Sequence, residues 1–199
     1  MRPLLAIAVT LLLPTTLALT TGCGGTTVTR VDEKTDVDLS GNWNAGDSRR
    51  NAEVLIADCL QRPWADDFKK TNNRPPVVKI GRIKVITNGD VVNTDIFTND
   101  LVRALVNSGK VQAVASNSEV DQAREERKDQ DVNASEKTRK ESFQETGTDF
   151  LIIGTINVQD DQANGVRHKF YSTDLKMTDV KSQIQVWFGN NKISKIVTR

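Results

Sequence analysis

The chain has 199 residues, with 27 basic and 26 acidic side chains and a formal net charge of +1. Hydrophobic residues make up 37% and charged residues 27%, a composition typical of one soluble globular domain with some processing sequence. This balance of charge argues against nucleic-acid binding, which favours a clustered basic surface, and against a polybasic segment that lies on a membrane.

Residues 1–22 are predicted to be a secretory signal. Arg2 supplies a positive start, and residues 4–13 form an apolar run that is too short for a comfortable transmembrane helix. The run Thr20-Thr21-Gly22-Cys23 resembles a bacterial lipobox, in which the cysteine sulfur receives diacylglycerol and becomes the mature N-terminus. We therefore expect Cys23 to be the lipid attachment site; the alternative is an ordinary signal followed by an incidental cysteine.

The segment after the cysteine is predicted to be a tether. Residues 24–37 are small, polar and charged, without an apolar period, which is typical of a linker rather than a fold. Gly24 takes the place of the Asp that would resemble an inner-membrane retention signal. The resemblance implies the periplasmic face of the outer membrane as the destination, with acyl chains on Cys23 as the anchor.

Residues 38–64, DLSGNWNAGDSRRNAEVLIADCLQRPW, predict a turn and then an amphipathic helix that packs on a sheet. Asp47 or Ser48 is the expected N-cap, and Pro63 ends the helix because it has no N–H to donate. Apolar residues recur at helical spacing on one buried stripe: Ala52, Leu55, Ile56, Cys59 and Leu60. The charged positions fall on the solvent side: Arg49, Arg50, Glu53 and Asp58.

The two cysteines, Cys23 and Cys59, are not expected to form a disulfide. One follows the apolar leader, and the other lies on the buried stripe of the helix. We interpret Cys59 as a small core residue rather than a reactive thiol.

The next elements alternate between strand and helix. Residues 77–86 have strand composition with a switch of parity at Gly81, which predicts a bulge. Asn93 or Thr94 caps a helix that ends before Gly109, the expected left-handed cap. A short strand over residues 110–115 follows. Two further helices are predicted over residues 120–128, with a solvated surface, and 135–146.

Strands are predicted to dominate the rest of the chain. The apolar run at residues 149–158 predicts a central strand buried on both faces, followed by a loop at residues 160–165. Residues 166–179 and 182–188 predict a hairpin, and residues 189–191 a turn into a last short segment. The expected fold class is therefore α/β: residues 38–199 form a single layered domain, a mixed sheet of about four or five strands packed with helices.

No catalytic or metal-binding pattern stands out. The single histidine, His168, lies between basic neighbours and is interpreted as an exposed strand residue. The acidic pairs at residues 66–67 and 160–161 are expected in turns or loops, solvated rather than catalytic. We find no phosphate-binding loop, nucleophile elbow or metal-ligand cluster. The sequence therefore predicts a protein that is not an enzyme, with no cofactor, no metal and no small-molecule substrate.

Several blocks resemble the LpoB-type lipoprotein activators of penicillin-binding proteins. Besides residues 38–64, these are DLVRALVNSGKVQAVA (100–115), REERKDQ (124–130), NASEKTRKESFQETGTDFLIIGTI (133–156), KFYSTDLKMTD (169–179) and QVWFGNNKISKI (185–196). The resemblance implies a fold like the N-terminal domain of TolB and an outer-membrane lipoprotein. It also implies that the chain binds a small non-catalytic domain of a bifunctional class A penicillin-binding protein and stimulates peptidoglycan synthesis. The residues that contact this partner cannot be identified from the sequence.

Two alternatives remain open at this point. One is a structural or export component of the curli-secretion type, whose related fold needs long amphipathic strands to build a pore; this chain has no spare length for them. The other is a periplasmic adaptor with another partner. The tether, residues 23–37, departs from the long Pro- and Gln-rich linkers of some family members, because its 15 residues reach at most about 50 Å.

Overall fold

The computed structural model describes residues 28–32, 35, 37–114, 122–126, 128 and 147–198. It divides the chain into two units, residues 1–33 and 34–199. The described part of the first unit, residues 28–32, contains no helix or strand. The second unit holds the folded domain.

The domain is built on a five-stranded mixed sheet with the strand order β2-β1-β3-β4-β5. β2, β1 and β3 are parallel, and β3, β4 and β5 are antiparallel neighbours. The predicted fold class is confirmed, and β3 occupies the predicted central place. The strands span β1 (Val77–Ile86), β2 (Gln112–Ala113), β3 (Phe150–Ala163), β4 (Val166–Asp179) and β5 (Gln185–Thr198).

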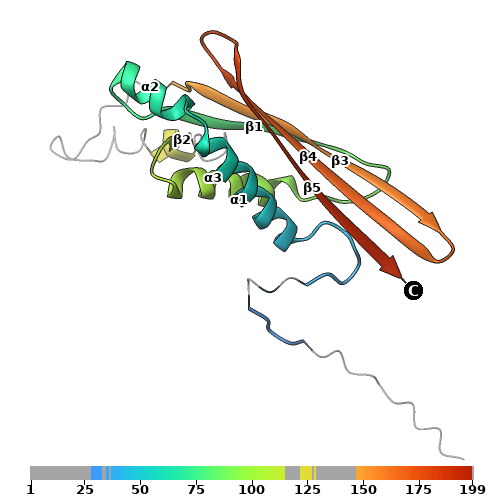
Figure 1. Ribbon diagram of the computed structural model, residues 1–199. Coiled ribbons are helices and arrows are strands. Elements are labelled where there is room, and N and C mark those ends of the chain that lie inside the picture. Colours follow the sequence, from blue (N-terminus) through green and yellow to red (C-terminus); the bar gives the residue numbers. More distant parts are fainter. Residues whose placement is uncertain are drawn as a thin grey trace, which may run out of the picture. The chain divides into compact units, whose positions relative to one another are not determined.

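Three helices lie on one face of the sheet: α1 (Ala45–Gln61), α2 (Trp64–Asn72) and α3 (Thr94–Asn107). Figure 1 shows α1 and α3 side by side across this face. The apolar stripe predicted for α1 is confirmed, since all of its members are buried except Leu60, which is half-buried. The stripe joins one core with side chains of the other elements, among them Trp43, Phe97, Leu101, Ile152, Ile156, Tyr171, Leu175 and Met177.

The predicted start of α1 is wrong. The N-cap is Asn44, whose side-chain oxygen accepts from the Asp47 amide at 3.0 Å, while Asp47 Oδ2 accepts from the Asn44 amide at 2.9 Å. This reciprocal capping box satisfies two backbone amides, so the helix starts a turn earlier than predicted. Ser48 lies inside the helix and is buried.

Pro63 ends α1 as predicted, but α2 begins directly after it and was missed as a separate helix. Pro63 stands at the N-cap of α2, where its missing N–H costs nothing. Trp64 is buried and packs edge-on against Phe150 of β3, with ring centroids 5.0 Å apart. This contact fixes the second helix on the same face of the sheet as α1.

The predicted loop at residues 160–165 is wrong apart from its last two residues. β3 continues to Ala163 and pairs with β4 through a two-residue turn at Asn164 and Gly165, with φ values of 50° and 77°. Both residues are left-handed, as a type I′ hairpin turn requires.

The predicted turn at residues 189–191 is also wrong, because β5 runs through it without interruption and pairs with β4 along its length. A Cβ at position 189 would collide with the ring of Trp187, so Gly189 leaves room for that indole on the helix-covered face. Gly189 therefore serves packing rather than a turn.

Among the other predictions, some are confirmed and some are wrong. The bulge in β1 is confirmed by a register shift between Ile80 and Ile83, and Asn93 is the N-cap of α3. Gly109 has a φ of 67°, as a left-handed cap requires. β2 is shorter than predicted. β3 is not buried on both faces, since Ile153 is 42% exposed. Residues 122–126 are helical, and the predicted helix at 135–146 lies outside the described residues.

Candidate functional site

The segment before α1, residues 37–44, lies against the helix-covered side of the sheet, and we call it the arm. Lys195 of β5 binds it with three contacts. Its Nζ donates to Asp38 Oδ1, to the Asn42 carbonyl at 3.2 Å and to Asp47 Oδ2 at 2.6 Å. The Asp47 side chain is fully buried and that of Lys195 is 8% exposed. Loss of either partner would leave the other charge unpaired and away from water.

A second lysine holds the arm from β4. Lys169 Nζ donates to the Asn42 side chain and to Asp90 Oδ1 at 2.7 Å, with 1% of the lysine side chain exposed. Tyr171 donates to the other oxygen, Asp90 Oδ2, at 2.7 Å and lies 3.1 Å from the Gly41 carbonyl. Burial and the neighbouring Asp90 carboxylate raise the pKa of Tyr171 well above its usual value, so its hydroxyl keeps its proton.

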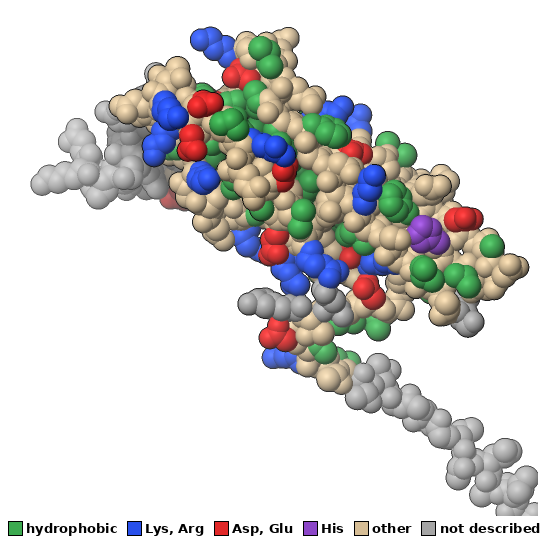
Figure 2. Space-filling model, viewed as in Figure 1, with side chains coloured by type: hydrophobic (Ala, Val, Ile, Leu, Met, Phe, Trp, Pro, Cys, Tyr) green, Lys and Arg blue, Asp and Glu red, His purple; other side chains and the backbone are tan. Residues whose placement is uncertain are grey.

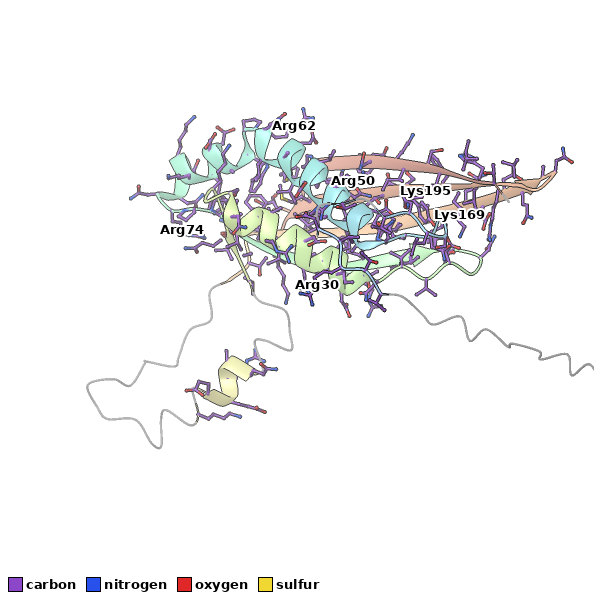
Figure 3. The ribbon with its side chains drawn as sticks, turned by 90° about the horizontal axis from the view of Figure 1, so that it is seen from below. Arg30, Arg50, Arg62, Arg74, Lys169 and Lys195 are labelled. Carbon is purple, nitrogen blue, oxygen red and sulfur yellow. The ribbon has the colours of Figure 1, made fainter. Side chains whose placement is uncertain are left out.

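The two lysines form one cluster with the arm. Figure 3 shows Lys169 and Lys195 close together, with Arg74 toward the other end of the domain. Both bind Asn42, one through the side chain and the other through the backbone. We call Asp38, Asn42, Asp47, Asp90, Lys169, Tyr171 and Lys195 the arm cluster. The Lys195 ammonium lowers the pKa of Asp38 through a hydrogen bond, although that carboxyl is partly exposed.

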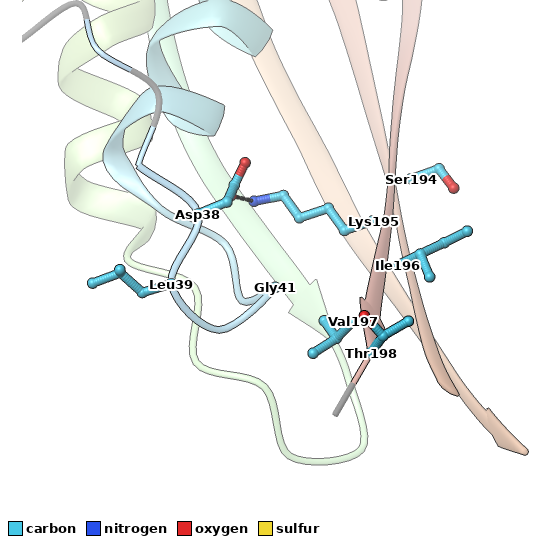
Figure 4. Close-up of a pocket in the computed structure, with 8 residues that line it drawn as sticks. All are labelled: Asp38, Leu39, Gly41, Ser194, Lys195, Ile196, Val197 and Thr198. Carbon is cyan, nitrogen blue, oxygen red and sulfur yellow. Dashed lines mark hydrogen bonds and ion pairs between the residues drawn. The ribbon is translucent and has the colours of Figure 1, made fainter. Parts of the chain in front are cut away.

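A groove of about 450 Å³ lies between the arm and the C-terminal part of β5. In Figure 4, Lys195 and Val197 reach from the strand toward the arm, whereas Ser194 and Ile196 point to the other side. Gly41 has a φ of 70°, and a Cβ there would collide with Val197. Glycine is therefore required where the arm approaches the strand.

Two further carboxylates, Asp149 and Asp58, accept hydrogen bonds from arginine and tryptophan side chains away from the arm cluster. Arg74 forms a bidentate pair with Asp149, with both N–O distances at 2.7 Å, and the same carboxylate accepts from the Val77 amide at 2.8 Å. Burial opposes the charged form of Asp149, but these donors outweigh it and lower its pKa. Asp58 accepts from Trp187 Nε1 at 2.8 Å and from Arg62 at 2.7 Å, and its pKa is lowered chiefly by the Trp187 bond.

These lowered pKa values predict how stability depends on pH. Because folded Asp149 and Asp58 are more acidic than the ordinary value of 3.8, the unfolded chain takes up protons first as the pH falls. The free energy of unfolding should therefore be constant above about pH 5 and fall below about pH 4. Urea unfolding across this range measures it. Asp149→Asn should make the acid slope shallower; a slope that equals the wild-type slope would contradict the assignment.

The predicted site residues lie as follows. Cys23 falls outside the described residues. Cys59 is fully buried, and burial raises the pKa of its thiol to about 12, which agrees with a core role. His168 is exposed on β4 as predicted, and its Nε2 lies 2.7 Å from Ser194 Oγ. Asp66 and Asp67 lie in the first turn of α2 rather than in a loop.

The exposed side chains of Ser194 and His168 form a hydrogen bond between β5 and β4. Nucleophilic serine sites need a group that orients the histidine and donors for an oxyanion. In residues 37–114 and 147–198, no carboxylate bonds to the second ring nitrogen of His168. Asp160, expected in the loop, instead lies in β3 and pairs with Arg167, which lowers its pKa.

The described part of the chain shows neither a metal cluster nor a membrane-spanning helix. There, no three His, Cys, Asp or Glu side chains gather so that they could hold a metal ion. None of the helices described is both long and apolar enough to cross a bilayer. Figure 2 shows basic and acidic side chains interspersed over the visible face of the domain.

Three solved structures are similar to parts of this chain. A C-terminal domain of LpoB from Salmonella enterica is 15% identical, with 75% of this chain and 99% of that chain covered and a TM-score of 0.44. The Escherichia coli domain is 18% identical, covering 60% and 83%, with a TM-score of 0.38. Lipoprotein GNA1162 from Neisseria meningitidis is 10% identical, covering 61% and 84%, with a TM-score of 0.40.

The comparison with curated proteins finds no match. The family described as "Peptidoglycan-synthase activator LpoB" matches residues 47–193. The match runs from the first turn of α1 through most of β5, and so includes the three helices and the core of the sheet. The chain belongs to the LpoB family of peptidoglycan-synthase activators.

Proposed function

We propose that this protein is a lipid-anchored regulator that binds a bifunctional class A penicillin-binding protein and activates its peptidoglycan synthesis. The observation that carries the proposal is the family match over residues 47–193, nearly the whole folded unit. A regulatory role follows from the family, and the identity of the synthase is our inference. The proposed organisation is a signal at residues 1–22, a tether at 23–37 and a binding domain at 38–199.

The arm cluster sets where the tether ends and therefore how far the domain can lie from the proposed anchor at Cys23. The Val37 carbonyl accepts from Asn44 at 3.2 Å, and Asp38 binds Lys195, so the arm is held from its first residues. A tether of 15 residues therefore ends at the arm, with a mean span of about 20 Å and a limit of about 50 Å. Because the linker contributes only effective concentration, affinity for the synthase must come from the domain surface.

The lipid anchor gives a prediction of its own. Cys23→Ser removes the thiol that would receive diacylglycerol, so the precursor should remain unprocessed. Labelling by a fatty-acid analogue in cells should be abolished, while Cys59→Ser should retain full labelling because that thiol is buried in the fold. Persistent labelling of the Cys23 variant would refute the assignment.

The proposed function is tested with a glycan-polymerisation assay. Protein that lacks residues 1–36 keeps the arm and should bind a class A synthase of the same organism and increase its rate. The assay compares the synthase alone, with the wild-type domain, and with a domain unfolded by Cys59→Asp. A folded domain that neither binds nor stimulates at about 50 µM would contradict the proposal, since regulatory complexes are tighter than this.

A further inference from the structure

The face of the sheet opposite the helices carries a distinct set of side chains, which we call the open face. Inward-pointing Ile152 and Ile156 are buried, whereas Ile153 is 42% and Phe188 49% exposed. Within residues 37–114 and 147–198, no helix covers this side. The open face comprises Arg82, Lys84, Ile153, Thr155, Asp174, Lys176, Phe188 and Lys192.

Four cations on the open face have no ion-pair partner among the described residues: Arg82, Lys84, Lys176 and Lys192. The acid among them, Asp174, instead accepts from Asn157 at 3.2 Å and from Asn190 at 2.7 Å. The Asp174 carboxylate thus accepts its hydrogen bonds from side-chain amides and not from the cations, which remain able to bind a ligand. The eight residues of the open face therefore carry four cations against one carboxylate, a net positive charge.

Apolar side chains lie next to these cations on neighbouring strands. Lys84 pairs with Thr155 across β1 and β3, Ile153 with Lys176 across β3 and β4, and Lys176 with Phe188 across β4 and β5. The Lys176 Nζ lies 5.8 Å from the centre of the Phe188 ring. Lys84 and Lys176 flank β3 two residues out of register, so their Cα atoms are about 12 Å apart, and Asp174 lies directly across Thr155 from Lys84.

A cleft of about 260 Å³ opens on this face, lined by the cations Arg82, Lys84 and Lys176 and by one carboxylate, Asp174. Its volume fits one sugar or amino-acid unit and is below the usual range for whole ligands. A linear ligand that carries one unit in the cleft would continue across the strands past Phe188 and Lys192. The geometry therefore suits a polymer with spaced negative charges.

We propose that the open face binds the cell-wall glycopeptide polymer, the carboxylate-bearing product of the synthases that this family activates. Compact lysine ammonium groups suit single carboxylates spaced along the stem peptides. Exposed Ile153 and Phe188 can pack against the C–H faces of sugars. An acidic protein is the less favoured occupant, because lysine is depleted at protein–protein interfaces and three of the four cations are lysines. The inference goes beyond the proposed function, since it requires no synthase.

The test is co-sedimentation of the full-length chain, purified in detergent, with insoluble cell-wall sacculi free of protein. Wild-type protein should pellet with sacculi, and about 0.3 M salt should release most of it by screening. Lys84→Glu with Lys176→Glu should reduce the bound fraction at least tenfold, and Lys84→Gln with Lys176→Gln about threefold. Both side chains are exposed, so folding should persist, as circular dichroism can verify.

Three controls separate the possible ligands. Lys69→Glu with Lys70→Glu adds the same charge on exposed positions of α2, in the helical layer, and should leave binding unchanged. Sacculi whose carboxylates have been amidated should bind at least fivefold less protein, and vesicles with phosphatidylglycerol should bind none through the open face. Equal sedimentation of wild type and the double Glu variant with sacculi would overturn the proposal. So would a double Glu variant that loses binding to vesicles or to the synthase but keeps its binding to sacculi.

Discussion

Cys59→Asp is expected to lower the free energy of unfolding by about 4–5 kcal/mol, enough to unfold many domains of this size. The Cys59 side chain is fully buried on the stripe of α1, and burial raises the pKa of its thiol to about 12. An aspartate there would have to take up a proton or remain as a buried charge without a cation. Urea unfolding followed by circular dichroism measures the loss.

Two variants separate the charge from the volume. Cys59→Ala should cost about 1–2 kcal/mol through a small cavity, and Ala57→Asp, at an exposed position of the same helix, less than about 0.5 kcal/mol. The thiol should react slowly with a maleimide in native protein and rapidly in urea. Fast labelling of native protein would mean that Cys59 is not on the buried face.

Apolar periodicity predicted the helical layer well, because it reports directly on burial. Leu55, Ile56 and Cys59 of α1, and Phe97 and Leu101 of α3, are all buried as their spacing requires. The same signal failed for β3, where continuous apolar sequence suggested burial on both faces. Ile153 shows that an apolar run also arises when part of one face is exposed to solvent.

Local polar signals were interpreted less well. The spacing of Asn44 and Asp47 is that of a capping box and could have located the start of α1. Gly189 with its two asparagines predicts a turn, yet the strand continues because the glycine makes room for Trp187. That reason depends on which face the indole occupies, and no short-range pattern reveals it.

The arm cluster could not have been predicted as a unit. Lys169 and Asp90 are 79 positions apart, and Lys195 and Asp47 are 148 apart, so only the completed fold brings them together. One signal was present: Lys169 shares its parity on β4 with Tyr171, Leu175 and Met177, which all point into the core. A lysine in such a row indicates a buried cation that needs a carboxylate, without identifying which one.

Lys169→Ala is expected to cost about 3–5 kcal/mol of unfolding free energy. The substitution leaves the Asp90 carboxylate, whose side chain is 9% exposed, with the Tyr171 hydroxyl but without its ammonium partner. It also removes the bond to Asn42, so the arm should loosen. Hydrogen exchange of a peptide that covers residues 38–44 should become at least tenfold faster than in wild type.

A double-mutant cycle isolates the ion pair from the lost packing of the lysine stem. Asp90→Ala and Lys169→Ala together should cost less than the sum of the two single changes by about 1–3 kcal/mol, because neither charge is then left alone. Lys192→Ala, on the exposed side of β5, is the matched control and should change stability by less than about 0.5 kcal/mol. Additive losses in the cycle, with unchanged exchange of the arm, would show that Lys169 acts through packing alone and that the arm is held by Lys195.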